Sequence, residues 1–216
     1  MGYCPLAGVR NITGESRASA VLILNDPATG YPIACLESSI ISAVRTAASA
    51  ALAADRLAAA RGGARPRRLG FVGAGLIARF AHTYLTGNGW EFDEIGVHDL
   101  LDEHSAGLAS YLRRADSAPV RVHNSAESLI KDADLIVFAT VAGEPHVEEP
   151  SWFAHGTLFD VLAGKAAVPA DQPVVFSPFG LGVLDLGVGR FVYDRVVAAG
   201  QLDVVEDFYA ELERYG

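Results

Sequence analysis

The stretch "RLGFVGAGLIARF", residues 68–80, joins an apolar run typical of a strand to the start of a helix through a turn of small residues. In a nucleotide-binding turn of the form G-x-G-x-x-A, Gly73 makes the tight turn and Gly75 lets the backbone approach a pyrophosphate. Ala78 lets the helix pack closely on the strand, and the pyrophosphate lies against the N–H groups of a helix that begins near Leu76. Alone, the match is weak, because three small residues can equally serve packing.

Strand and helix patterns alternate strictly after this turn. Short apolar runs, typical of buried parallel strands, are expected at residues 68–73, 94–100, 120–124, 134–140 and 173–177. Helical patterns are expected at residues 76–85, 102–114, 126–130, 184–199 and 202–215. This alternation is typical of a doubly wound parallel sheet. We therefore predict an α/β protein with a Rossmann-like fold.

An acid closes the second of these strands. Asp99 stands at about the spacing from the turn that is expected of a residue binding the ribose 2′-hydroxyl. No arginine follows in "DLLDEHS", residues 99–105, where a 2′-phosphate would need one. With this context the turn is predicted to bind NAD rather than NADP. The expected cofactor-binding residues are Gly73, Ala74, Gly75, Leu76, Ile77 and Asp99.

A β-hairpin and a long helix are expected before the turn. The β-rich runs at 18–25 and 31–38 flank "DPATG", a turn sequence. An alanine-rich helix follows at 42–63, with Ser42 as its N-cap and Gly62-Gly63 ending it. Because a lone hairpin with apolar strands exposes an edge and an apolar face, we expect a homodimer formed through residues 18–38.

Arg45 lies in the first turn of that expected helix, where a cation opposes the helix dipole. One interpretation is a solvated or ion-paired arginine, which spacing alone favours. The other is that Arg45 and the helix N-terminus together bind a substrate carboxylate.

Composition narrows the function classes. The 216 residues are half hydrophobic and carry a net charge of −9, which disfavours nucleic acid and anionic membranes as partners. With no leader and only Cys4 and Cys35, far apart, we expect a cytoplasmic protein. The six histidines show no metal-ligand spacing, so no metal is expected; His98 and His123 are interpreted as structural. No Ser/His/Asp or Cys/His signature supports hydrolase chemistry.

Four segments resemble the ornithine cyclodeaminase/μ-crystallin family. They are "LILNDPATGYPIACLESSIISAVRTAASAALAADRLA" (22–58), "GFVGAGLIA" (70–78), "ADLIVFATVAGEP" (133–145) and "VFSPFGLGVLDLGVG" (175–189). The wording is most similar to the dehydrogenases of 2,3-diaminopropionate biosynthesis, which serve siderophore and peptide-antibiotic pathways. The resemblance implies NAD-dependent oxidation of N-(2-amino-2-carboxyethyl)-L-glutamate, followed by hydrolysis to 2,3-diaminopropionate and 2-oxoglutarate.

The resemblance also implies roles for individual residues. It implies that Arg45 binds the substrate carboxylate, and so favours this interpretation over that of a solvated or ion-paired arginine. Thr46 and Thr140 are expected to line the cofactor cleft. Ser177 and Gly180 lie where the family's last cofactor-facing loop closes on the nicotinamide side.

The sequence departs from the family pattern in two places. The family's substrate domain has several strands before the hairpin and an active-site lysine, whereas the first lysine here is Lys131. Asp160 does not match the family's catalytic aspartate. Either the protein is shortened, with an altered active site, or the sequence omits parts of a longer chain. His146 and His155 border the cleft side and are weak candidates for proton transfer, so the catalytic residues stay unassigned.

Four segments and three functions follow as expectations. The segments are a partial substrate and dimerisation segment (1–41), a connecting helix (42–63), an NAD-binding domain (64–182) and C-terminal helices (183–216). We favour an enzyme, the dehydrogenase, acting on a small amino-acid substrate. The alternatives are an ornithine-type cyclodeaminase and an inactive NAD-binding protein that lacks the family lysine and aspartate.

Overall fold

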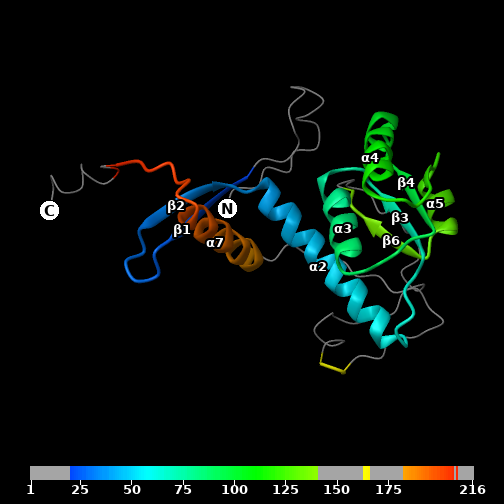
Figure 1. Ribbon diagram of the computed structural model, residues 1–216, viewed down its shortest axis with the longest axis horizontal. Coiled ribbons are helices and arrows are strands. Elements are labelled where there is room, and N and C mark those ends of the chain that lie inside the picture. Colours follow the sequence, from blue (N-terminus) through cyan, green and yellow to red (C-terminus); the bar gives the residue numbers. More distant parts are fainter. Residues whose placement is uncertain (1–19, 141–162, 166–181, 207, 209–216) are drawn as a thin grey trace. The chain divides into compact units, whose positions relative to one another are not determined.

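A four-stranded parallel sheet forms the core of the larger of two units in the computed structural model (Figure 1). The structure describes residues 20–140, 163–165, 182–206 and 208. The larger unit comprises residues 42–181, and the smaller one comprises residues 1–41 together with 182–216. The division therefore falls inside a helix that the sequence assigned to a connecting segment of its own.

The strands of the larger unit are β3 (Arg68–Val72), β4 (Glu94–His98), β5 (Val120–Val122) and β6 (Leu135–Phe138). Their order is β5-β4-β3-β6, and all three pairings are parallel. The strand order reverses between β3 and β6, as it does in half of a dinucleotide-binding fold. The predicted doubly wound parallel sheet is confirmed within the described residues. The strand predicted at 173–177 lies outside them.

Helices cover both faces of this sheet. Buried residues of α3 (Leu76–Gly87) and α4 (Asp102–Ala115) share one hydrophobic core with the side chains on one face of the strands. On the other face, α5 (Ala126–Asp132) packs where β3 and β4 carry glycines. A Cβ on Gly70 would lie 2.5 Å from the Leu129 side chain, so the missing side chain allows α5 its close approach. These three helices begin at the predicted residues.

Helix α2 (Ser39–Ala60) begins three residues before the predicted N-cap, so the assignment of Ser42 as N-cap was wrong. The Glu37 carboxylate, at the end of the hairpin, accepts the Ser39 N–H at 2.7 Å and satisfies one free donor of the first turn. Hydrogen bonds around Ser39 hold the pKa of Glu37 below its usual range. Arg45 consequently lies in the second turn, where the helix dipole acts weakly on it, and its expected place in the first turn is corrected.

The end of α2 agrees with the sequence. Gly62 and Gly63 have φ values of +90° and +84°, and the Gly63 N–H donates to the Ala58 carbonyl at 2.8 Å. These are features of a glycine helix stop.

Asp55 ties α2 to the sheet unit. Its carboxylate accepts the Trp90 indole N–H at 2.7 Å, the Asn88 amide at 2.8 Å and the Arg65 guanidinium at 2.9 Å. The Arg65 guanidinium also stacks over the Trp90 ring, 4.9 Å from its centroid. Three donors from the loop after α3 and from the segment before β3 thus meet on one side chain of α2. The helix that carries Arg45 and Thr46 is thereby fixed to the unit that carries the glycine-rich turn.

The predicted hairpin is confirmed in the smaller unit. Strands β1 (Val21–Asn25) and β2 (Pro32–Glu37) pair antiparallel, and the Asp26 carboxylate accepts the N–H groups of Ala28 and Thr29 in the turn between them. Leu22 and Leu24 are buried against α7 (Gly182–Ala198), while Val21 and Ile23 on the other face are 51% and 54% exposed.

Helix α7 confirms the predicted helix at 184–199, but residues 202–206 are not helical, contrary to the sequence prediction. Gly200 has a φ of +64°, and the Gln201 N–H bonds back to the Val196 carbonyl, so the chain leaves the helix here. The two β-branched residues Val204 and Val205, each 71% exposed, then lack the packing that would hold them in a helix. Within the described residues, no helix has the length and apolar character needed to cross a membrane.

Candidate functional site

The glycine-rich turn lies at the carboxyl ends of three parallel strands. Val72 pairs with His98 and with Phe138, so Gly73, Asp99 and Ala139 follow these strands at the same edge of the sheet. The Gly73 N–H donates to the His98 carbonyl at 2.8 Å. In doubly wound sheets, ligands bind at this edge, where the strand order reverses.

Gly73 is required by its geometry. Its φ is +98°, a backbone conformation that residues other than glycine rarely adopt. A Cβ at this position would lie 2.6 Å from the carbonyl carbon and oxygen of Ala139 and 2.8 Å from the Thr140 nitrogen. The turn is therefore pressed against the end of β6, which is the tight-turn role predicted for Gly73.

Gly75 differs from Gly73, because no described atom lies close to the position that a side chain would occupy. It is the N-cap of α3 with φ −83° and ψ −166°, and no side chain caps the helix. A Cβ on Gly75 would meet no atom of the described residues within 4 Å. Leu76 is exposed and Ile77 is half-buried. Ala78 lies on the buried face of α3, as its predicted packing role requires. Uncapped N–H groups beside open space fit a pyrophosphate group.

Asp99 is joined directly to this turn. Its Oδ2 accepts the Ala74 N–H at 2.8 Å, and its Oδ1 accepts the Leu101 N–H at 3.0 Å. The side chain is 18% exposed, and His104 Nδ1 lies 3.4 Å from Oδ1. The structure thus brings together the turn and the acid that the sequence could connect only by spacing. Oδ2, which accepts one hydrogen bond from the described residues, has a second lone pair that suits a ribose hydroxyl.

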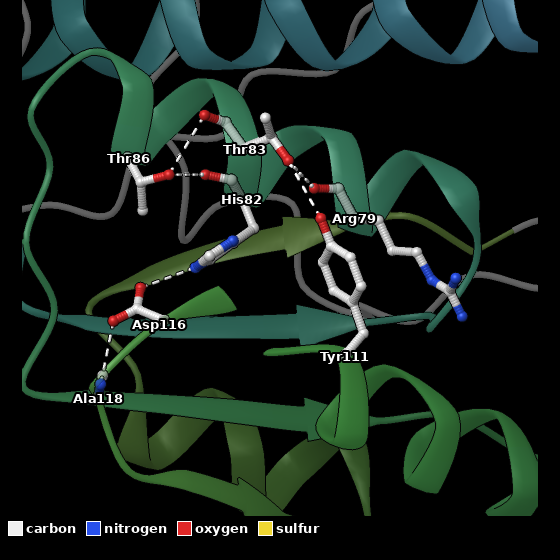
Figure 2. Close-up of polar contacts among 7 residues, drawn as sticks. All are labelled: Arg79, His82, Thr83, Thr86, Tyr111, Asp116 and Ala118. Atoms are coloured by element: carbon white, nitrogen blue, oxygen red, sulfur yellow. Dashed lines mark hydrogen bonds and ion pairs between the residues drawn. The ribbon is translucent and has the colours of Figure 1, made fainter. Parts of the chain in front are cut away.

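A histidine–aspartate pair links α3 to the end of α4. Figure 2 shows His82 of α3 pointing toward Asp116, at the end of α4, with Nε2 and Oδ2 2.8 Å apart. Burial opposes the charged form of Asp116, but bonds from the Ala118 N–H and from His82 hold its pKa below the usual value. The Thr83 hydroxyl also lies 3.4 Å from the Tyr111 hydroxyl, a second link between these helices. These contacts join the middle of α3 to α4 and to the residue that follows α4.

The remaining predicted site residues are less closely joined. Arg45 is half-buried, and its Nη2 donates to the Ser42 hydroxyl at 3.1 Å. The Thr46 hydroxyl donates to the Ser42 carbonyl at 2.8 Å, within the same helix. Thr140 directly follows Ala139, at the edge that holds the turn. Ser177 and Gly180 lie outside the described residues, as do the candidates His146, His155 and Asp160.

Two histidines of the sheet have structural contacts. His98 Nδ1 lies 3.0 Å from the His123 carbonyl oxygen, and His123 Nδ1 lies 3.1 Å from the Ser128 hydroxyl. Burial of His123 lowers its pKa below the ordinary value. These contacts agree with the structural interpretation. The described part of the chain contains no cluster of three or more potential metal ligands.

Sequence reasoning missed one residue of the site, His104. It is the third residue of α4, and the motif gave no reason to connect it with Asp99. The available signal was its position five residues after the acid, in the first turn of the following helix.

Comparison with known proteins identifies the family of the chain. Residues 7–167 match the family model described as "Ornithine cyclodeaminase/mu-crystallin family". The chain is 33% identical over 168 residues to the N-((2S)-2-amino-2-carboxyethyl)-L-glutamate dehydrogenase of Staphylococcus aureus. That alignment covers 74% of this chain and 48% of the relative, so the chain spans about half the relative's length. The resemblance predicted from sequence is confirmed.

Solved structures share the fold. The structure of Thermococcus litoralis Delta(1)-pyrroline-2-carboxylate reductase in complex with NADH and L-proline matches with a TM-score of 0.77 and 20% identity, covering 91% of this chain and 78% of that one. An archaeal alanine dehydrogenase dimer with bound NAD matches with a TM-score of 0.77 and 20% identity, covering 94% and 78%. These matches confirm the predicted fold class.

Proposed function

The chain belongs to the ornithine cyclodeaminase/mu-crystallin family, and from this premise we propose that it binds NAD(H) at the turn 73–78 and acts on an amino-acid-derived amine. The hydrogen bond from the Ala74 N–H to Asp99 carries the proposal, because it joins the phosphate-binding turn to the ribose-binding acid. The NADH and NAD bound to the two structural relatives support the choice of cofactor. Bound NAD would supply the hydride acceptor.

Residues of this chain would divide the work of binding. The N–H groups at the start of α3 would hold the pyrophosphate, with Gly75 leaving room for it. Asp99 would accept a hydrogen bond from the ribose 2′-hydroxyl. Arg45 would hold a substrate carboxylate and thereby orient the carbon that loses hydride. Thr46, Thr140, Ser177 and Gly180 would line the rest of the cleft.

We propose N-(2-amino-2-carboxyethyl)-L-glutamate as the substrate, on the basis of the similarity to the staphylococcal dehydrogenase. Removal of hydride from the carbon that bears the secondary amine, with loss of the amine proton, gives an imine. Water then adds and splits the imine into 2,3-diaminopropionate and 2-oxoglutarate, a reaction suited to siderophore or peptide-antibiotic synthesis. Net formation of NADH would support this reaction over that of a cyclodeaminase, which regenerates its NAD.

Cofactor choice tests the role of Asp99. Titration should show that NADH binds much more tightly than NADPH, because a carboxylate repels a 2′-phosphate. Asp99→Ala should weaken the binding of NADH by about tenfold to a hundredfold, the scale of a hydrogen bond to a charged group. It should also narrow the difference in affinity between NADH and NADPH. Glu91→Gln is the matched control, since it removes an exposed acid before β4 rather than after it. Equal affinity of the wild type for both cofactors would rule out the assignment.

Arg45 tests the substrate site separately from the cofactor. Arg45→Ala should leave the affinity for NADH nearly unchanged. It should weaken the binding of 2-oxoglutarate and L-glutamate by about 2–3 kcal/mol, because a charge-assisted pair is lost.

Arg56→Ala, an exposed arginine of the same helix, serves as the control and should bind all ligands as the wild type does. If Arg45→Ala melts much lower and weakens every ligand equally, Arg45 is a structural residue.

We also propose that two copies pair through the hairpin. The outward residues Val21, Ile23 and Ile33 are 51%, 54% and 41% exposed, an apolar face that favours association. The matching alanine dehydrogenase is a dimer, which supports the pairing of two copies of this chain. Light scattering of the purified chain measures the state directly.

A further inference from the structure

Asn88 and Gly89, which follow α3, form the one Asn-Gly pair in the sequence. Such a pair is chemically labile, because a glycine has no side chain to shield its nitrogen from the asparagine Cγ. In the reaction the Gly89 nitrogen gives up its proton and forms a bond to Cγ. The Cγ–Nδ2 bond breaks, ammonia leaves, and water opens the cyclic imide at either carbonyl. The product is aspartate or isoaspartate in place of Asn88.

Hydrogen bonds hold the reacting groups of this pair in the folded chain. The Asn88 Nδ2 donates to the Asp55 Oδ2 of α2 at 2.8 Å, and the Asn88 carbonyl accepts Arg65 Nη1 at 3.0 Å. The Gly89 N–H donates to the Thr86 carbonyl at 2.9 Å. The attack therefore requires the Asn88 side chain to leave Asp55 and the Gly89 nitrogen to give up its bond to Thr86.

Asp55 couples this reaction to the attachment of α2. Its Oδ1 accepts the Trp90 indole N–H at 2.7 Å and the Arg65 guanidinium at 2.9 Å, while Oδ2 depends on the Asn88 amide. An aspartate in place of Asn88 would offer Oδ2 no donor and would place a second carboxylate against it. Like charges this close repel, and the Asp55 side chain is only 24% exposed to screening water. Conversion would thus weaken a contact that fixes the helix carrying Arg45.

We propose that Asn88 is a modification site, where spontaneous deamidation marks chains whose α2 has separated from the sheet unit. While Asp55 and Arg65 hold the Asn-Gly pair, the reaction is slow. When α2 separates, Asn88, which is exposed to water, becomes free to react with the Gly89 nitrogen. The acid that forms opposes the return of α2, so the separation is recorded in the covalent structure. The proposal is independent of the cofactor site.

The test follows Asn88 in the whole chain by tryptic peptide mapping and mass spectrometry, in mildly alkaline buffer. Trypsin releases the peptide 80–113, in which Asn88 is the single asparagine, so a side-chain amide that becomes an acid is assigned directly. The folded wild type should deamidate at least about tenfold more slowly than the same chain in concentrated urea, because the reaction waits for local opening.

Asp55→Ala should raise the rate in buffer by about tenfold, since it removes the partner that holds the amide. Asp93→Ala is the matched control, because Asp93 is an exposed acid that pairs with Arg67 instead, and it should keep the wild-type rate. Far-UV circular dichroism verifies that both variants are folded. A folded Asp55→Ala variant with the wild-type rate would contradict the proposal.

A second comparison keeps the proposal testable if Asp55→Ala does not fold. Asn88→Asp carries the product of the reaction, and Asn88→Ala removes the same donor without adding a charge. In urea denaturation Asn88→Asp should have the lower free energy of unfolding of the two. The proposal is wrong if these two variants are equally stable, or if folded and urea-unfolded wild type deamidate at the same rate.

Discussion

Gly75→Val is expected to abolish NADH binding while the far-UV circular dichroism stays close to that of the wild type. The backbone of Gly75, at φ −83° and ψ −166°, is accessible to any residue, and within the described part of the chain no atom lies within 4 Å of an added Cβ. Valine at this position is therefore sterically compatible with the folded backbone. The same open space lies in front of the uncapped N–H groups of α3, where the pyrophosphate would approach, and two added methyl groups would fill it.

The expected loss is more than a hundredfold in affinity, because the phosphate would lose its contacts with several N–H groups at once. Fluorescence titration with NADH measures it. Gly107→Val is the matched control, since Gly107 also has open space around it but lies within α4. The control should bind NADH as the wild type does. If Gly75→Val binds within threefold of the wild type, the turn serves packing alone and the proposed cofactor site is wrong.

Much of the sheet unit could be predicted because its signals are local. Each strand is a short apolar run, and each following helix begins at or next to a residue that marks its start, as Ser125 does by accepting the Ser128 N–H. Gly73 and Gly75 could be given different roles from the motif alone. The structure agrees through two independent features, a crowded site at Gly73 and an open one at Gly75.

The start of α2 could not be predicted, because its capping group comes from outside the helix pattern. Ser42 has the chemistry of an N-cap, but the Glu37 carboxylate reaches the Ser39 N–H only once the hairpin has placed the end of β2. Ser42 is instead taken into the helix, where its hydroxyl accepts a hydrogen bond from Arg45. A preference for one residue type at helix ends is weak when tertiary structure supplies another partner.

Long-range contacts were also beyond the sequence. Asp55 reads as a surface acid on a helix, yet it accepts hydrogen bonds from three residues of other segments, including Trp90. His104 likewise reads as one of six scattered histidines. Its place beside Asp99 depends on how tightly the chain turns from β4 into α4, which no periodic pattern encodes.

Gly73→Ala, unlike Gly75→Val, is expected to destabilise the fold, lowering the free energy of unfolding by roughly 2–6 kcal/mol. Two costs add here: the positive φ of +98°, and a Cβ forced to 2.6 Å from the Ala139 backbone. Backbone strain of this kind costs about 1–3 kcal/mol, and overpacking in a tight site costs a similar amount. Urea denaturation of the variant and the wild type measures the sum.

A small backbone shift cannot relieve the clash without cost, because hydrogen bonds hold the backbone at both Gly73 and Ala139. The Gly73 N–H donates to the His98 carbonyl, and the Ala139 N–H donates to the Val72 carbonyl, each at 2.8 Å. A shift that relieved the contact would weaken the junction of β3 with β4 or with β6. Gly62→Ala separates the two costs, since Gly62 has a φ of +90° but no atom of the described residues within 4 Å of the added Cβ. Gly62→Ala should cost only the strain, about 1–3 kcal/mol. If Gly73→Ala costs no more than that, the turn is not pressed against β6, and the close junction that places Gly73 beside Asp99 and Thr140 would have to be abandoned.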